Sequence, residues 1–453
     1  AADWANEQAE IRTGALARPM TRSAYPSVVA LVEERARQSP RAVALSRGSD
    51  SWTYAALLAF ARGAAQALRA RGIGAGDVVA VAGEQRFETI GAMLAVWMAG
   101  GVLMPLDAAT PPLRLRAQLE AARCRLVLDC GGPDLPAGAV PVVGLAELGG
   151  SAAPDFEPVP LGPDDPAYIF FTSGSTGTAK GIRGLHGGLG HFLCWQREQF
   201  GIAAADVFAQ LTRLSFDVML RDVFTPLASG ARLCLPPGES VMTDPWAWLR
   251  DAGITAIHVV PSLLSRWLAL PGSDKECPAL RLAFSAGEAL DSTVVDAFRR
   301  QVAAGCRIIN LYGPTETTLA KCWYEVPAVP ERGTQPLGAP LPETQIHVLD
   351  ENGLPCAPGA TGEIVIRTPH RSAGYLDAGG AQHAGFRPNP QRDDPADLLF
   401  CSGDLGRFDA AGVLHIAGRA DDQLKILGVR ISPQEVAATL AQHAAIRQAQ
   451  VIG

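Results

Sequence analysis

The stretch Tyr168-Ile-Phe-Phe-Thr-Ser-Gly-Ser-Thr-Gly-Thr-Ala-Lys-Gly181 passes from a run of apolar residues into a loop rich in glycine and hydroxyl groups. The apolar run predicts a buried strand. In such a loop, glycines let the backbone approach closely, N–H and hydroxyl groups donate to phosphate oxygens, and Lys180 supplies a positive charge. The spacing differs from a Walker A loop, which requires Gly-Lys-Ser/Thr. Taken alone, the stretch fits either a polyphosphate-binding loop or a flexible surface turn.

Apolar strands and helices alternate on both sides of this stretch. A helix is expected from about 88 to 99, between strands at 78–82 and 102–104. Further strands are expected near 231–235, 254–260, 280–285 and 307–312. This alternation is typical of βαβ units, whose parallel sheet is covered by helices on both faces. We therefore expect an α/β fold with two parallel-sheet subdomains.

The composition and hydrophobic pattern of the sequence change at three places along the chain. Residues 1–25 are polar and aperiodic, which predicts a linker. Residues 26–418 form the expected core, and from about 334 its short alternating segments predict a smaller β-rich subdomain. Residues 419–453 are expected to hold a hinge and the beginning of a truncated C-terminal subdomain.

Composition excludes several classes of function. The 453 residues are 48% hydrophobic and 19% charged, as in globular proteins, and the formal charge is −7. No basic field is available to attract a nucleic acid or an anionic membrane, so we expect neither partner. Nine cysteines without metal-binding spacing, and the lack of a secretion signal, favour a reduced, cytoplasmic protein.

Three later motifs carry side chains that suit a nucleotide. The run Asn310-Leu-Tyr-Gly-Pro-Thr-Glu-Thr-Thr318 places an aromatic ring, hydroxyls and a carboxylate at one turn. These groups can stack on a base, contact phosphate and bind Mg²⁺. Ser402-Gly-Asp404 offers a carboxylate for the ribose hydroxyls, and Gly418-Arg-Ala-Asp-Asp-Gln-Leu-Lys-Ile-Leu-Gly428 places charges at a predicted domain junction.

With these motifs the chain resembles the ANL family of adenylate-forming enzymes, and most closely the amino-acid adenylation domains of nonribosomal peptide synthetases. The resemblance extends from about Ser51 to Gly453. Five motifs occur in the family's order, including Leu214-Ser-Phe-Asp217. The resemblance implies that ATP activates an amino acid as aminoacyl-AMP. The aminoacyl group would then be transferred to the phosphopantetheine thiol of a carrier protein.

The resemblance also implies roles for individual residues. Lys180, Thr315 and Glu316 would be catalytic, Glu316 as the Mg²⁺ ligand, and Asp421 would be the hinge. The nucleotide would be held by Thr172, Ser173, Gly174, Ser175, Thr176, Gly177, Lys180, Asn310, Tyr312, Thr315, Asp404 and Arg419. Within that set, Tyr312 would stack on adenine and Asp404 would bind the ribose. Ala179 stands where the family usually has proline.

The implied substrate pocket follows from the Leu214 to Asp217 motif. Asp217 would pair with the α-ammonium group of the substrate, next to Phe216. The walls would be Val218, Arg221, Ser262, Phe284, Ala286, Leu311, Leu319 and Ala320, which are mostly apolar or small. Arg221 fits two interpretations: it pairs with an acidic or strongly accepting group of the substrate, or with an internal partner such as Asp222 or Glu288. The identity of the amino acid stays open.

Two other functions remain compatible with the sequence. An acyl- or aryl-CoA ligase shares the nucleotide motifs and differs chiefly at Asp217. A degenerate nucleotide-binding scaffold is the other, because the family's second lysine lies in a C-terminal domain and none of the four lysines matches it. For that reason we expect the 453 residues to adenylate poorly by themselves. His186, His191 and three tryptophans (Trp246, Trp248 and Trp267) are interpreted as structural.

Overall fold

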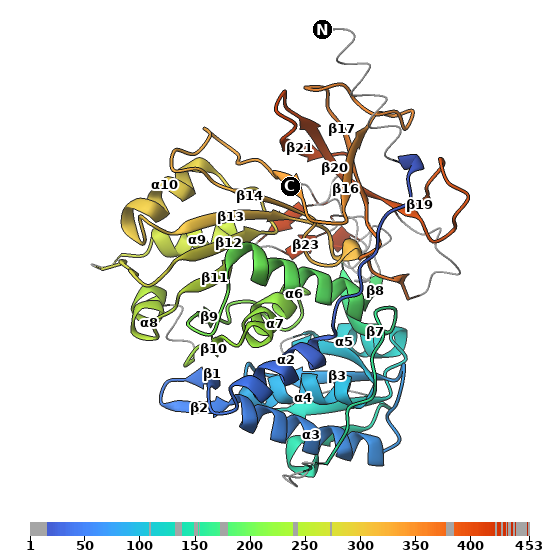
Figure 1. The fold of residues 1–453 in the computed structure, drawn as a ribbon, viewed down its shortest axis with the longest axis vertical. Helices are drawn as coiled ribbons and strands as arrows, with labels where there is room; N and C mark the ends of the chain where they lie inside the picture. Colours follow the sequence, from blue (N-terminus) through green and yellow to red (C-terminus); the bar gives the residue numbers. More distant parts are fainter. Residues whose placement is uncertain are drawn as a thin grey trace.

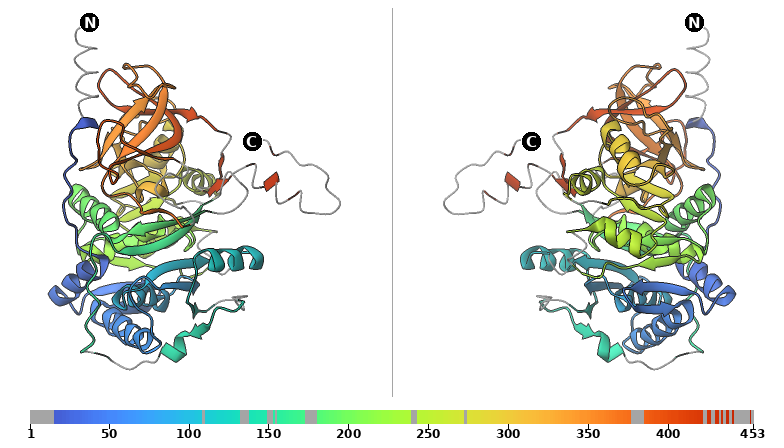
Figure 2. Two further views of the ribbon diagram at one scale, coloured as in Figure 1. Left: turned by 90° about the vertical axis from the view of Figure 1, so that its right-hand side faces the viewer. Right: turned by 90° about the vertical axis from the view of Figure 1, so that its left-hand side faces the viewer.

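In the computed structural model, the described residues are 16–107, 110–131, 138–148, 153, 155–172, 180–238, 243–271, 274–376 and 385–421, with short pieces from 424 onwards. The predicted Ser173, Gly174, Ser175, Thr176 and Gly177 lie outside them. Figures 1 and 2 show a β-rich sheet, a large mixed sheet and a second mixed sheet in succession along the long axis of the molecule.

The large sheet has, among the described residues, the strand order β15-β14-β13-β12-β11-β9-β10-β1-β2. Pairing is parallel from β13 to β1 and antiparallel at both edges. Its strands are β1 (Val43–Arg47), β2 (Asp50–Thr53), β9 (Val207–Ala209), β10 (Arg232–Cys234), β11 (Ala256–Val259), β12 (Leu282–Ala286), β13 (Arg307–Tyr312), β14 (Cys322–Glu325) and β15 (Ala339–Pro340).

The second sheet has the order β18-β8-β7-β4-β3-β5-β6 among the described residues. Its strands are β3 (Val78–Gly83), β4 (Val102–Asp107), β5 (Leu126–Cys130), β6 (Val142–Gly144), β7 (Pro166–Thr172), β8 (Lys180–Leu185) and β18 (Gly374–Tyr375). The predicted α/β class with two largely parallel sheets is confirmed. The two sheets do not correspond to two consecutive halves of the chain. The early strands β1 and β2 belong to the large sheet, whereas the later strands β7 and β8 belong to the second sheet.

The β-rich sheet joins β16, β17, β20 and β19 in that order, with β21 on β20. Its strands are β16 (Gln345–Leu349), β17 (Gly362–Arg367), β19 (Phe386–Pro388), β20 (Leu398–Phe408) and β21 (Leu414–Arg419), and a separate hairpin pairs β22 (Leu424–Ile426) with β23 (Val429–Ile431). All pairings in these sheets are antiparallel. The ring of Tyr312, at the end of β13, packs into the core of this sheet.

Helices cover both faces of the two mixed sheets. The helices are α2 (Val28–Gln38), α3 (Tyr54–Ala70), α4 (Phe87–Met98), α5 (Pro112–Ala121), α6 (His186–Phe200), α7 (Met219–Ser229), α8 (Pro245–Asp251), α9 (Pro261–Leu268) and α10 (Ser292–Gln301), with 3-10 turns η1 (Leu145–Leu148) and η3 (Thr315–Thr317). Helices α2, α3, α4, α6 and α7 share one core with residues of both sheets. Helices α8 to α10 pack on the far face of the large sheet, and α5 packs on that of the second.

Local sequence explains where several of these elements begin. Thr53 caps α3, as its side-chain oxygen accepts a hydrogen bond from the Ala56 N–H at 3.1 Å. Helix α4 is almost wholly apolar, and only Glu88 in it is not buried, because the helix lies in the core shared by both sheets. The tryptophans predicted to be structural pack accordingly, with the rings of Trp246 and Trp267 5.7 Å apart.

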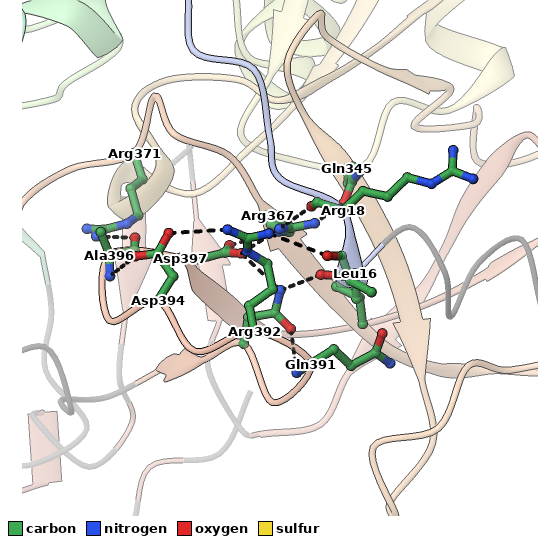
Figure 3. A network of polar contacts seen from close by, with 12 residues as sticks. Leu16, Arg18, Gln345, Arg367, Arg371, Gln391, Arg392, Asp394, Ala396 and Asp397 are labelled. Atoms are coloured by element: carbon green, nitrogen blue, oxygen red, sulfur yellow. Dashed lines mark hydrogen bonds and ion pairs between the residues drawn. The ribbon is translucent and has the colours of Figure 1, made fainter.

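Residues 16–25 are joined to the β-rich sheet through their backbone (Figure 3). The buried guanidinium of Arg367 donates to the carbonyl of Arg18 at 2.9 Å, and the Asn389 amide donates to the carbonyl of Leu16 at 2.8 Å. Leu16 itself is buried. Further along, Tyr25 lies edge-on to His191 and His370. The segment then continues along the molecule to α2 (Figure 1).

Candidate functional site

The expected phosphate loop begins and ends at one place in the second sheet. Thr172, the last residue of β7, pairs with Lys180, the first residue of β8. Both residues are partly exposed. Antiparallel pairing therefore brings the two ends of the expected loop together at Thr172 and Lys180. The roles of Thr172 and Lys180 toward phosphates stay predictions.

Tyr375 connects Lys180 with Glu316. Its hydroxyl donates to Oε1 of Glu316 at 2.6 Å, and the Nζ atom of Lys180 lies 5.7 Å from the centre of its ring. Glu316 is 1% exposed, and its backbone carbonyl accepts a hydrogen bond from Ser372 at 3.0 Å. Lys180 of the second sheet and Glu316 of the turn after β13 thus both contact Tyr375, which no sequence motif indicated. A signal was available, because Tyr375 is a polar aromatic residue directly after a glycine at the end of a loop.

The turn that presents Thr315 and Glu316 is tightly packed. A side chain at Gly313 would collide with the backbone of the following hairpin, at 2.5 Å from the carbonyl oxygen of Leu319. Thr318 and Leu319 adopt positive φ angles of 69° and 59°, which are costly for residues with a side chain. Only glycine fits at position 313, and the fixed turn sets the direction of the Thr315 and Glu316 side chains.

Asp217 lies next to this turn. Burial raises the pKa of Asp217 to about 6, while the hydroxyl of Thr315 and the charge of Arg221 oppose the rise and Glu316 adds to it. Asp217 is partly exposed, as are Phe216 and Val218 on either side of it. The predicted anchor of the substrate's ammonium group and the predicted phosphate and metal contacts are therefore neighbours in space, although about 100 residues separate them in sequence.

The predicted nucleotide residues from the β-rich sheet form one network. The hydroxyl of Tyr312 donates to Oδ2 of Asp404 at 2.8 Å, and Oδ1 of Asp404 is ion-paired with Arg419. The Arg419 guanidinium also binds both oxygens of Asp421, at 2.6 and 2.8 Å. Burial and the Asp404 carboxylate raise the pKa of Tyr312 well above its usual value, so its hydroxyl remains a donor. Hydrogen bonds and ion pairs thus connect the residue predicted to stack on the base, the residue predicted to bind the ribose and the predicted hinge residue.

Asn310 lies in β13, two residues before Tyr312. Its side-chain amide donates to the carbonyl of Pro336 at 2.7 Å, and the residue is buried. This bond fixes the orientation of the amide group. Its predicted contact with the nucleotide stays a prediction.

Five of the eight predicted wall residues of the substrate pocket belong to the core on one face of the large sheet. Ala286 and Leu311 are partners in adjacent strands, and Phe284 is on the same face of β12. Leu319 and Ala320 belong to the same core. All five are at most 6% exposed. Of the three remaining predicted wall residues, Arg221 and Ser262 are polar, and Val218 is partly exposed.

The only protein ligand that we predict for Mg²⁺ is Glu316. The described residues contain no cluster of three His, Cys, Asp or Glu side chains arranged for a metal. One carboxylate is nevertheless a suitable donor set, because Mg²⁺ at phosphotransfer sites keeps several waters and takes the other ligands from substrate phosphates. The residues present therefore fit a metal that arrives with the nucleotide.

Comparison with known proteins identifies the family. A family model described as "AMP-binding enzyme" matches residues 32–376. The chain belongs to the AMP-binding enzyme family. The predicted kinship with adenylate-forming enzymes is thereby confirmed, and the matched residues of this AMP-binding enzyme include Lys180, Asp217, Glu316 and Tyr375.

Relatives of the chain include nonribosomal peptide synthetases. Tyrocidine synthase 3 of Brevibacillus parabrevis is 32% identical over 436 residues, which are 95% of this chain and 7% of the relative. The chain thus spans a small fraction of that protein's length. The holo-PA1221 synthetase protein, described as containing adenylation and PCP domains and bound to a vinylsulfonamide inhibitor, superposes with a TM-score of 0.80 at 27% identity, covering 92% of this chain and 72% of that one.

A second solved structure superposes equally well on the AMP-binding enzyme. The synthetase FmoA3, in a form described as bound to α-methyl-L-serine-AMP, has a TM-score of 0.80 and 29% identity, covering 89% of this chain and 46% of that one. In the described residues of this chain, no helix is long and apolar enough to cross a membrane.

Proposed function

We propose that this chain activates an amino acid with MgATP, forms aminoacyl-AMP with release of pyrophosphate, and passes the aminoacyl group to a carrier protein within a nonribosomal peptide synthetase. The observation that carries the proposal is the position of Asp217 beside Thr315 and Glu316. An acidic group for an α-ammonium lies next to the groups predicted for phosphate and metal. An amino acid held there presents its carboxylate toward the nucleotide.

The chemistry matches what this site offers. A carboxylate oxygen of the amino acid forms a bond to the α-phosphorus, the bond from that phosphorus to the bridging oxygen breaks, and pyrophosphate leaves with the electron pair. The nucleophile is already an anion, so no general base is required. The barrier comes from repulsion between anions, and the site must supply positive charge and oriented donors.

Individual described residues have separate roles in this reaction. Lys180 places a cation at the phosphate loop, with Tyr375 between it and Glu316. Glu316 would hold Mg²⁺, which when bound neutralises phosphate charge and orients the phosphates. Thr315 would donate its hydroxyl to the α-phosphate, while Asp404 accepts the ribose hydroxyls and Tyr312 packs against the base.

The second half of the reaction needs a thiol. The phosphopantetheine sulfur attacks the carbonyl carbon of aminoacyl-AMP, the bond to the phosphate oxygen breaks, AMP leaves, and the thiol proton passes to solvent. Support for a carrier protein as the acceptor comes from the PCP domain in holo-PA1221, whose fold matches this chain over 92% of its length.

Exchange of labelled pyrophosphate into ATP tests the proposal. We expect exchange that requires both Mg²⁺ and an amino acid, measured across a panel of amino acids and their desamino analogues. Exchange supported as well or better by the desamino acids would instead indicate an acyl- or aryl-activating enzyme. A lack of exchange with all of them, in a chain long enough to include the family's second lysine, would contradict an adenylating function.

A further inference from the structure

The segment 372–376 joins the turn after β13 to strand β8. At one end of the segment, the Ser372 N–H donates to the carbonyl of Glu316 at 3.0 Å. At the other end, the Leu376 N–H donates to the carbonyl of Gly181 at 2.9 Å. One short segment is therefore hydrogen-bonded to both elements that carry the predicted metal and phosphate groups.

Strand pairing places Tyr375 of this segment beside Lys180. Tyr375 pairs with Ile182 in the register of β18 and β8. Lys180 lies two residues before Ile182, and alternate residues of a strand point to the same face of the sheet. The two side chains are therefore diagonal neighbours across the strands, a distance that long and aromatic side chains can bridge. The Nζ atom of Lys180 accordingly lies 5.7 Å from the centre of the ring.

The hydroxyl of Tyr375 acts on the carboxylate of Glu316. Their separation of 2.6 Å is typical of a strong hydrogen bond from a hydroxyl to an ionised acceptor. The same segment also holds the backbone of Glu316 through Ser372. One contact on the main chain and one on the side chain thus fix the direction of the carboxylate. An ionised carboxylate has about four lone-pair sites, so the bond from Tyr375 leaves capacity for a metal ion.

Orientation matters strongly at a site with one protein ligand. Glu316 is the one protein ligand that we predict for Mg²⁺, so no second ligand would correct its direction. Hydrogen bonds to a metal ligand orient it, and losing such a bond typically costs roughly 10- to 100-fold in metal affinity or activity. The ammonium group of Lys180 sits on a flexible stem, and contact with an aromatic face restricts where it lies.

We propose that Tyr375 is a positioning residue with two separable functions. Its hydroxyl orients Glu316 toward the metal of MgATP, and its ring holds the ammonium group of Lys180 in place for the phosphates. This inference rests on the proposed function, because it assumes that Glu316 binds Mg²⁺ and that Lys180 binds phosphate.

Affinities for MgATP and for metal-free ATP, measured by calorimetry on the whole chain, separate the two functions. Tyr375→Phe removes only the hydroxyl, so MgATP should bind roughly tenfold more weakly and metal-free ATP as before. Tyr375→Leu also removes the ring, so metal-free ATP should then bind about two- to fivefold more weakly as well. Thermal unfolding checks that each variant folds. Tyr324→Phe is the matched control, because its hydroxyl contacts Glu331 on β14's side of the large sheet, and it should change neither affinity.

Double mutants test whether Tyr375 acts through these two residues. In a Glu316→Gln background, Tyr375→Phe should have no further effect on MgATP affinity. In a Lys180→Ala background, Tyr375→Leu and Tyr375→Phe should bind metal-free ATP equally well. A tyrosine with only a structural role would instead give losses that add in both backgrounds.

The outcomes separate this inference from the proposed function. If Tyr375→Phe binds MgATP as tightly as the parent, weakens both forms of ATP equally, or gives additive losses, the inference is wrong while the proposed function stands. If Glu316→Gln by itself leaves MgATP affinity unchanged, or the parent chain binds neither form of ATP, the proposed roles are wrong and the inference fails with them.

Discussion

Glu316 is the residue whose charge has the clearest consequence. It is buried, accepts a hydrogen bond from Tyr375 and lies on the fixed turn after Gly313. Its carboxylate is an anion in a desolvated place, and a bound Mg²⁺ would compensate that charge. Removing the charge while keeping the shape therefore separates its role toward the metal from its role in packing.

We predict that Glu316→Gln weakens binding of MgATP by at least about tenfold and leaves the affinity for metal-free ATP nearly unchanged, because only the anionic metal ligand is lost. Titration of both nucleotide forms by calorimetry measures the difference. Glu325→Gln is the matched control, because Glu325 lies on nearby β14 and pairs with Arg307 at the surface. An equal loss for both nucleotide forms would mean that Glu316 acts through packing.

Asp217 should make amino-acid binding depend on pH. Burial raises its pKa to about 6, above the ordinary value of 3.8, and only the ionised carboxylate attracts an ammonium group. We therefore predict that affinity for the aminoacyl analogue is constant above about pH 7 and falls by roughly tenfold for each pH unit below 6. Asp217→Asn should bind weakly at every pH, without this slope. A parent chain whose affinity is the same at pH 5 and pH 7.5 would contradict the assignment.

At the scale of elements, the strands that flank the site follow from local sequence. Apolar runs predicted β3, β4, β7, β10, β11, β12 and β13 close to their observed bounds. The turn after β13 was also found in sequence, because a glycine and clustered polar residues mark it, whereas the Ser402-Gly-Asp404 motif lies within β20. Pairing order was not predictable in the same way: nothing local indicates that β1 pairs with β10 or that β8 pairs with β18.

The contacts of residues 16–25 show why part of the structure leaves no pattern in sequence. Their carbonyl groups at Leu16, Ala17 and Arg18 accept hydrogen bonds from Asn389, Arg392 and Arg367. Every residue has a carbonyl, so such contacts require no particular side chains. The segment is polar and aperiodic in sequence, yet its described part is docked on the β-rich sheet (Figure 3).

We predict that a chain beginning at residue 26 is less stable than one beginning at residue 16, by about 2–5 kcal/mol. The loss combines one buried leucine with several backbone hydrogen bonds. Hydrogen exchange should accelerate in β17 and β19, which lie under the segment. As a control, Arg22→Ala removes an exposed ion pair with Asp164 and should change stability by less than about 1 kcal/mol. Identical exchange in the two chains would show that the docking contributes nothing.

At the scale of the whole molecule, the candidate site is built where the sheets meet. Lys180 comes from the second sheet, Asp217, Thr315 and Glu316 come from the large sheet and its connections, and Asp404 comes from the β-rich sheet. Sequence motifs indicated these residues, although only Lys180 lies at the end of a strand, whereas Asp404 lies within β20 and Asp217 in the turn before α7. Their proximity and the contact through Tyr375 depend on packing between distant segments, which no single motif encodes.

The central claim is that one site holds a nucleotide and, through Asp217, an amino acid. The most direct measurement compares the affinity of the chain for an aminoacyl-sulfamoyladenosine and for its desamino counterpart, in the parent and in Asp217→Ala. Breaking an ion pair that the bound compound buries costs roughly 3–5 kcal/mol, so the parent should prefer the amino compound by two to three orders of magnitude, and the variant should lose most of that preference. Equal affinity of the parent for the two compounds, or an undiminished preference in Asp217→Ala, would contradict the account.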